Sequence, residues 1–351
     1  MAKNGYLVAV VEWISEEDGL ANAICDELIG LGHCTHIVRP KTSDPGEADV
    51  VFTFGPYGNY LAVVSHLAGA LAERRPIFVH WNTEGMPDPR LPWALKSAVG
   101  AGRSWIGRLD ESYNGRAGSL VRGLTSSWQN RILRFRYLGD YHYAYRKGWL
   151  DVFSDSSAVY ADLHRQHGLP TITAPWGATK RWYADLGLER DIDVLWLGQR
   201  GSRRRGQLLD HIRQELLDYN VKVHVIDNEE NPFVFGRKRT EVLNRAKITL
   251  NLTRTWFDDN FSRFAMAAPN RSLIVSEPLL PHCPSYEAGV HYVSECAEDL
   301  AQTILYYLEH DDERQRIVDS AYELTTGQLT FRNSIAQIMQ AVDQVRGNRT
   351  A

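Results

Sequence analysis

The feature of this sequence that most restricts its fold is a regular alternation of short, unbroken apolar runs with segments of helix length. Such runs lie within residues 6–12, 49–54 and 76–81 in the first half and within residues 193–198 in the second, and residues 247–252 read as a further strand that Thr249 and Asn251 interrupt. Strands buried on both faces read as continuous apolar runs, and parallel strands need a crossover between them, usually a helix. The alternation therefore predicts an α/β protein with parallel sheets covered by helices.

The length of the chain divides this pattern into two domains. A chain of 351 residues exceeds one ordinary hydrophobic core. Pro175, Trp176 and Gly177 interrupt the alternation near its middle. We therefore predict a parallel-sheet domain at residues 1–177 and a second at residues 178–328. A final amphipathic helix at residues 329–351 is expected to pack back on the first domain.

The bulk composition excludes several classes of protein. The formal net charge is −4, so the chain lacks the overall positive charge typical of proteins that bind nucleic acid or anionic membranes. Its four cysteines are scattered without ligand spacing, which predicts no metal site and fits a reducing cytoplasm. No apolar run approaches the roughly 18 residues that a membrane span needs. We expect a cytoplasmic protein without a membrane span.

The most informative polar stretch follows the run at residues 193–198. Arg203, Arg204 and Arg205 lie where this predicted strand passes into a helix. Ligands of parallel sheets bind outside the carboxyl ends of the strands, and helix N-termini attract anions. We therefore predict that these arginines bind a phosphate or diphosphate, with help from Arg200 or Lys238. The alternative is a solvated helix start, because runs of charge usually face solvent.

A second unusual stretch spans residues 91–147. It is rich in Arg, Tyr and Trp and has weak periodicity, so we expect helices and loops. A basic and aromatic run of this kind is compatible with RNA binding. The acidic balance of the whole chain favours an acceptor groove or a solvated face instead.

Several segments of the second half resemble one family. Residues 191–198 with the arginines after them, residues 242–252, residues 263–268 and residues 273–277 resemble the C-terminal half of CgeB-type glycosyltransferases, which belong to the GT-B superfamily. The resemblance covers roughly residues 150–340. It implies two Rossmann-like domains facing a cleft, with a C-terminal helix crossing back. It also implies metal-independent transfer of a sugar from a nucleoside-diphosphate sugar to an unknown acceptor, without a further cofactor.

The resemblance also suggests which residues bind the donor. Gly198 and Arg263 lie within the matching motifs, and Asp227 and Asn228 follow a predicted strand where the base would lie. Turn formation is the alternative reading of Asp227 and Asn228. The family's ribose-binding glutamate falls on or near Met266, whose thioether cannot accept two hydroxyl hydrogen bonds. The expected substitutes for that carboxylate are Asp258, Asp259 and Arg271.

Inverting transfer requires a base that takes the acceptor's proton. His80, Glu84 and Glu12 follow or end predicted strands of the first domain and are the candidates. A histidine in an apolar run is more often part of the core, and a retaining enzyme would need no such base. Two other functions stay open: a catalytically silent nucleotide-binding or scaffold protein of this fold, and a nucleotide-sugar epimerase.

Overall fold

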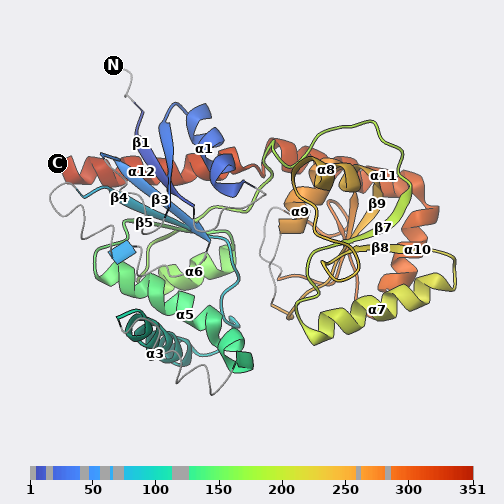
Figure 1. Cartoon of the computed structure of the whole chain (residues 1–351), viewed down its shortest axis with the longest axis horizontal. Helices are drawn as coiled ribbons and strands as arrows, with labels where there is room; N and C mark the ends of the chain where they lie inside the picture. Colours follow the sequence, from blue (N-terminus) through green and yellow to red (C-terminus); the bar gives the residue numbers. More distant parts are fainter. Residues whose placement is uncertain are drawn as a thin grey trace. The chain divides into compact units, whose positions relative to one another are not determined.

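The computed structural model describes residues 5–12, 19–39, 47–55, 64–65, 75–112, 126–257, 262–280 and 286–350. For residues 107, 109–112, 126–133 and 350 it describes the backbone only. The chain divides into two compact units, which are Met1–Ala174 with Ile335–Ala351, and Pro175–Ser334. Each unit is built on its own parallel sheet (Figure 1).

The sheet of the first unit has six parallel strands in the order β2-β1-β3-β4-β5-β6. The strands are β1 Leu7–Val11, β2 Cys34–Val38, β3 Val50–Gly55, β4 Ile77–Asn82, β5 Val152–Asp155 and β6 Thr171–Thr173. All residues of β3, β4 and β5 are buried, as the unbroken apolar runs predict. The predicted strands of the first half are therefore confirmed.

The helices of the first unit are α1 Leu20–Gly30, α3 Trp93–Ser112, α5 Ser126–Arg146, α6 Ala158–Gln166 and most of α12 Phe331–Thr350. Helix α1 ends next to Gly32, whose φ of 92° lies in the left-handed region that glycine enters without steric cost. The sequence after β3 also predicts a helix between residues 58 and 73, a segment of which the structure describes residues 64 and 65 alone.

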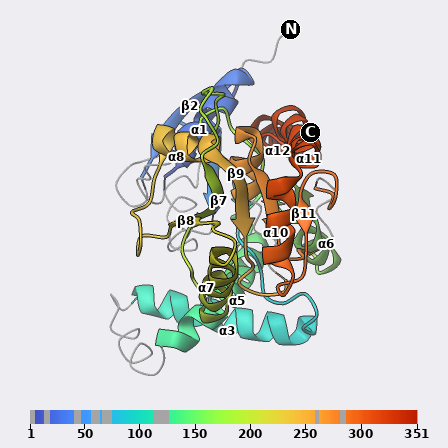
Figure 2. The same cartoon turned by 90° about the vertical axis from the view of Figure 1, so that its right-hand side faces the viewer.

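The Arg-, Tyr- and Trp-rich stretch forms a helical hairpin in which α3 and α5 lie side by side (Figure 2). Two glycines let the backbones touch: a Cβ on Gly139 would lie 2.1 Å from the carbonyl oxygen of Gly100. A Cβ on Gly100 would lie 2.8 Å from the carbonyl oxygen of Phe135. The weak periodicity of this stretch therefore reflects a close helix pair whose contact face uses glycine in place of large apolar residues.

Helix α12 joins the two ends of the chain. The Tyr6 hydroxyl donates to Asp343 Oδ1 at 2.5 Å, and Arg349 donates to Asp151 Oδ1 at 2.8 Å. The apolar side chains Ile335, Ile338, Met339 and Val342 are buried. The unit boundary at residues 334 and 335 therefore falls inside this helix.

The sheet of the second unit has five parallel strands in the order β11-β10-β9-β7-β8. They are β7 Ile192–Leu197, β8 Val223–Ile226, β9 Ala246–Asn251, β10 Leu273–Ser276 and β11 Val293–Ser294. The helices are α7 Arg203–Leu217, α8 Gly236–Arg245, α9 Ser262–Ala267, α10 Leu300–Glu309 and α11 Asp311–Gly327. The predicted strands and helices of this half are confirmed, with ends that differ by a few residues.

Side chains of β7 alternate between the two faces of this sheet. Val194 and Trp196 pack with α7 and α10, whereas Leu195 and Leu197 pack with α8 and α9. Both faces are therefore covered, as a sheet of parallel strands requires. The predicted fold class, two parallel-sheet domains of α/β type, is confirmed.

Candidate functional site

The carboxyl ends of four parallel strands in the second unit bring polar residues to one edge of the sheet. Gly198 follows β7, Asp227 follows β8, Thr253 comes two residues after β9, and Glu277 follows β10. In open parallel sheets ligands bind at this edge. The edge is therefore the candidate donor site.

The turn from β7 into α7 presents the start of a helix at this edge. Gly198 has φ 124° and Gly201 has φ 71°, which residues with a Cβ rarely adopt. Ser202 caps α7, because its Oγ accepts a hydrogen bond from the backbone N–H of Arg205 at 3.3 Å. The unpaired N–H groups of the first turn carry partial positive charge and suit an anion.

The three arginines of this turn have different surroundings. Arg203 is exposed and forms no hydrogen bond or ion pair with a described residue. Arg204 binds Glu277 with two nitrogens and donates to the Thr253 carbonyl oxygen at 3.1 Å. The hydrogen bond with Glu277 raises the pKa of Arg204. Arg203 and the exposed part of Arg204 are therefore the cations that a ligand can reach.

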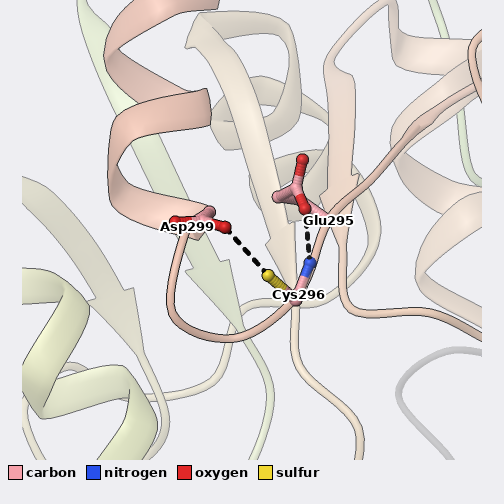
Figure 3. Close-up of side chains that lie close together, drawn as sticks. All are labelled: Glu295, Cys296 and Asp299. Atoms are coloured by element: carbon pink, nitrogen blue, oxygen red, sulfur yellow. Dashed lines mark hydrogen bonds between the residues drawn. The ribbon is translucent and has the colours of Figure 1, made fainter.

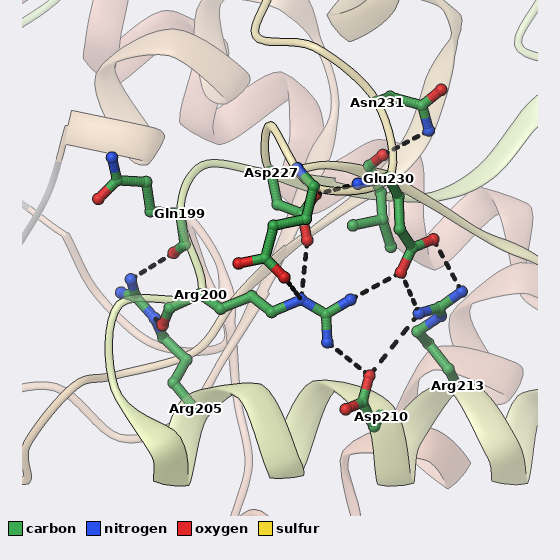
Figure 4. Close-up of polar contacts among 10 residues, drawn as sticks. Gln199, Arg200, Arg205, Asp210, Arg213, Asp227, Glu230 and Asn231 are labelled. Carbon is green, nitrogen blue, oxygen red and sulfur yellow. Dashed lines mark hydrogen bonds and ion pairs between the residues drawn. The ribbon is translucent and has the colours of Figure 1, made fainter.

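Arg205 instead stabilises the turn by hydrogen bonds to its backbone (Figure 4). Its guanidinium is buried and donates to the carbonyl oxygens of Arg200, at 2.5 Å, and Gln199. It also lies 5.5 Å from the ring centre of Trp196. The structure therefore brings Arg205 to the predicted place but turns its side chain into the protein.

Arg200 lies at the centre of an ion-pair network that links α7 to the loop after β8 (Figure 4). It donates to Asp227 Oδ2 at 2.8 Å, to Asp210 Oδ1 at 2.7 Å and to Glu230 Oε1 at 2.6 Å. The hydrogen bond that Arg200 donates to Asp227 is the largest cause of its raised pKa. Three carboxylates neutralise the charge of Arg200. Because two of them belong to the loop and one to α7, Arg200 holds the loop in place.

Asp227 shapes the loop that was expected to meet the donor base. Its Oδ1 accepts the backbone N–H groups of Glu229 and Glu230, each at 2.8 Å. Burial raises the pKa of Asp227, but these hydrogen bonds and Arg200 outweigh burial and lower it. Asn228 is exposed in the left-handed region at φ 69°. Asp227 therefore forms the turn, and Asn228 is free to point at a ligand.

Arg263 ties three strand ends together beneath the site. It donates to the Leu197 carbonyl oxygen at 2.8 Å and to Asn251 Oδ1 at 2.9 Å. Asn251 in turn donates to Ser276 Oγ at 2.9 Å. A Cβ on Gly198 would lie 3.0 Å from the Arg263 guanidinium, so the glycine admits this arginine. Arg263 is buried and supports the site from below.

The remaining predicted donor residues have different surroundings. Arg271 precedes β10 at the opposite edge of the sheet, where it binds Asp319 at 2.5 Å. Lys238 is exposed on α8, and Met266 is half-buried on α9 against the core. Arg271 therefore lies away from the candidate site, whereas donor binding by Lys238 and Met266 stays a prediction. The two aspartates expected to replace the ribose carboxylate, Asp258 and Asp259, lie outside the described residues.

His80 of the first unit lies in the interior of β4 and is 0% exposed. Its Nδ1 is 2.9 Å from Thr53 Oγ1, and its ring stacks on Phe153 at 5.9 Å. Burial lowers the pKa of His80 to about 3. These surroundings agree with the alternative that His80 is part of the hydrophobic core.

The two glutamates lie at the carboxyl edge of the first sheet. Glu12 follows β1 and forms an ion pair with Arg39 at 3.6 Å. Glu84 follows β4, and its carbonyl oxygen accepts from Asn82 Nδ2 at 3.0 Å. Both therefore occupy the edge at which a parallel sheet binds its ligands.

The sequence did not point to a row of buried polar side chains at the same edge, which are Asn82, Asp155, His164 and His142. Asp155 ends β5 and accepts from Asn82 Nδ2 at 2.7 Å. His164 Nε2 lies 3.8 Å from Asp155 Oδ2, and His164 Nδ1 lies 3.1 Å from His142 Nε2. Burial lowers the pKa of both histidines, that of His142 to about 4. The position of Asp155 at the end of a short strand-like segment, after Val152, Phe153 and Ser154, was the available signal.

A further group, Glu295, Cys296 and Asp299, lies between β11 and α10 (Figure 3). The Cys296 thiol donates to Asp299 Oδ2 at 3.0 Å, and this hydrogen bond is the main reason that the pKa of the thiol rises to about 11. The hydrogen bond to Asp299 therefore favours the protonated thiol. The group is exposed and borders a cavity of about 670 Å³.

Comparison with known proteins agrees with this architecture. Residues 203–340 match the sequence model of a family described as glycosyl transferase-like. That match begins at Arg203, the first residue of α7. A comparison with curated protein sequences finds no match.

Solved structures of similar fold are glycosyltransferases of GT-B type. Anabaena HepE in complex with UDP-glucose is 11% identical, with a TM-score of 0.58 over 97% of this chain and 100% of that one. Sucrose-phosphate synthase from Thermosynechococcus elongatus is 10% identical, with a TM-score of 0.56 over 98% of this chain and 100% of that one. A glycosyltransferase from Rickettsia africae is 10% identical, with a TM-score of 0.57 over the same shares.

These likenesses show the fold. None of the described helices is both long enough and apolar enough to span a membrane. The CgeB-type resemblance stays a prediction.

Proposed function

We propose that this protein is a glycosyltransferase that moves a sugar from a nucleoside-diphosphate sugar to an acceptor. The observation that carries the proposal is the start of α7, where a capped helix N-terminus and the reachable cations Arg203 and Arg204 meet at the carboxyl edge of the second sheet. The match of residues 203–340 to a glycosyl transferase-like family supports it.

The chemistry of transfer suits these groups. Negative charge develops on the diphosphate as it leaves the sugar, and donors fixed in advance stabilise that charge. Arg203 and the first N–H groups of α7 can supply such donors, and Glu277 holds Arg204 beside them. We propose that the leaving group is neutralised in this way, without a metal ion.

Loop 227–231 after β8 is the proposed contact for the donor base. The Arg200 network fixes this loop to α7, and Asn228 is the first exposed residue of the loop after the strand. HepE has been solved with UDP-glucose. UDP-sugars are therefore the first donors to test.

A second candidate function is a catalytically silent protein of the same fold. Two points favour it. Arg200 and Arg205 are occupied by acceptors within the protein, and the resemblance puts the family's ribose-binding glutamate on or near Met266. Such a protein would bind a nucleotide without turnover.

The test compares wild type with Arg203→Ala together with Arg204→Ala. We expect this double variant to bind UDP at least tenfold more weakly, because it loses two cations that face the diphosphate. The measurement is calorimetric titration with UDP. Arg237→Ala is the matched control, because Arg237 is an exposed helix arginine that pairs with Glu241 in α8.

Equal UDP affinity in both variants and wild type would remove the start of α7 from the site. Slow release of glucose from UDP-glucose by wild type would support the enzyme. Tight binding without any release, with acceptors of several classes present, would favour the silent protein.

A further inference from the structure

The hairpin of α3 and α5 holds a group of charged residues that the proposed function does not use. Because Gly100 and Gly139 bring the two backbones into contact, Arg103 and Arg108 of α3 lie beside Arg136 and Asp140 of α5. Arg136 Nε is 3.4 Å from Asp140 Oδ2. Burial raises the pKa of Asp140, whereas the charges of Arg136 and Arg108 lower it. These four side chains therefore form one electrostatic cluster.

The cluster carries an excess of positive charge. Among the side chains that the structure describes, three guanidinium groups surround one carboxylate, which leaves a net charge of 3 − 1 = +2. Burial lowers the pKa of Arg103, and the charge of Arg136 lowers it further, against the opposing effect of Asp140. A guanidinium keeps its proton at neutral pH, so this charge persists in a partly buried place. An anion would offset its cost.

The cluster also has hydrogen-bond donors without acceptors. Arg103 Nε and Arg108 Nη1 are buried and have no hydrogen-bond partner among the residues that the structure describes. A buried donor left without an acceptor destabilises the fold. The Arg108 guanidinium lies 3.8 Å from the ring centre of Tyr143, which fixes its position. The Arg136 side chain is 19% exposed, so the cluster is open to solvent.

We propose that Arg103, Arg108 and Arg136 bind a phosphate group. A phosphate monoester carries a charge of about −1.5 to −2 at pH 7 and offers three acceptor oxygens, which matches both the excess charge and the unused donors. The guanidinium fork binds two phosphate oxygens at once. A single carboxylate would neutralise only half of the excess.

The position of α5 relates this site to the first sheet. The Tyr141 hydroxyl donates to Asn82 Oδ1 at 3.2 Å, and Asn82 ends β4. Burial and the charge of Glu84 raise the pKa of Tyr137 on the same helix. The phosphate site therefore lies next to the ligand-binding edge of the first unit. This position suits a phosphate that is part of the acceptor. That assignment rests on the proposed function, whereas the anion site itself does not.

The test is a calorimetric titration with inorganic phosphate. We expect Arg103→Gln together with Arg108→Gln to weaken phosphate binding at least tenfold. The matched control is Arg90→Gln together with Arg237→Gln, which removes two exposed arginines that pair with Asp88 and Glu241. Unchanged affinity in the first double variant, or wild type that binds no phosphate at millimolar concentration, would overturn the proposal. Equal binding of acetate and phosphate would overturn it too.

Arg136→Lys provides a second route if the double variant unfolds. It keeps the charge and removes the planar fork, so phosphate binding should weaken while the melting temperature without phosphate stays unchanged. Unchanged binding in this variant would contradict the proposed contact.

Two ligands and two variants separate this inference from the proposed function. Arg203→Ala with Arg204→Ala should lose UDP and retain phosphate, and the α3 double variant should do the reverse. Wild type that binds phosphate but no UDP would remove the donor site and leave the anion site standing. Phosphate binding that depends on Arg203 and Arg204 would place the anion in the second unit and refute the inference.

Discussion

At the scale of single residues, the direction of a side chain decides its role. Arg204 and Arg205 are neighbours in sequence, yet Arg204 faces Glu277 at the surface and Arg205 donates to carbonyl oxygens inside the turn. The rule that ligands gather at strand ends correctly predicted the edge that these residues share. It could not predict the directions of the two side chains. The direction of Arg204 depends on Glu277, which is distant in sequence. The direction of Arg205 depends on the local turn at Gly201.

The same limit applies to Glu277 and Arg271. Glu277 follows β10 and meets the site, whereas Arg271 precedes β10 and lies at the far edge, although six positions separate them in sequence. Arg271 became a candidate because it lies close in sequence to Met266, on or near which the resembling family's ribose-binding glutamate falls. Glu277 follows an apolar run, residues 273–275, after one serine, so the strand-end rule could have named it.

His80 gives a prediction at the residue scale. Its pKa in the folded protein is about 3, below the value of about 6.5 in an unfolded chain, so the unfolded state takes up the proton first as pH falls. Stability should therefore decrease from about pH 6.5 downward, by up to about 1.4 kcal/mol per pH unit for this group. Urea unfolding at pH 7 and pH 5 measures the change.

Carboxylates and the other buried histidines also contribute to that pH dependence. His80→Phe isolates the contribution of His80, since Thr53 keeps its hydrogen bond to the Val79 carbonyl oxygen at 2.8 Å. The variant should lose less stability than wild type between the two pH values. An identical loss would show that His80 does not resist protonation in the folded state.

At the scale of elements, strands and helices of the described regions were predicted well because their apolar periodicity is strong. For residues 91–147 the sequence predicted helices and loops, but not the pairing of α3 with α5. The contact face of this pair includes Gly100 and Gly139, and glycine gives no apolar signal. Close backbone approach is a tertiary property, which a search for apolar stripes does not detect.

The hairpin contact leads to a prediction with an internal control. Gly139→Ala places a Cβ 2.1 Å from a backbone oxygen of α3, so the helices must move apart. We expect a loss of about 1–3 kcal/mol in the free energy of unfolding. Gly102→Ala meets nothing within 4 Å and should stabilise the helix by about 0.5–1 kcal/mol. Urea unfolding of both variants checks this, and a neutral Gly139→Ala would contradict the close contact.

At the scale of the whole molecule, the division of the chain does not follow its order. The first unit contains residues from both ends, and Tyr6 binds Asp343 across 337 positions. We predict that truncation after residue 334 unfolds the first unit. The loss of the buried Ile335, Ile338 and Val342 costs about 1.5–3 kcal/mol each, which in sum rivals the stability of a domain.

Limited proteolysis followed by mass spectrometry measures this effect. Cuts should spread through residues 5–174 of the truncated chain while residues 175–334 stay resistant. Resistance of both parts would show that the last helix is dispensable.

The shared helix α12 also has a consequence during synthesis. A ribosome makes residues 5–174 first, but the side chains that complete their core come from the last stretch to emerge. The second unit is completely synthesised at residue 334. It can therefore fold while the first unit still lacks residues 335–351. The nascent chain would then reverse the usual order, in which the amino-terminal domain folds first.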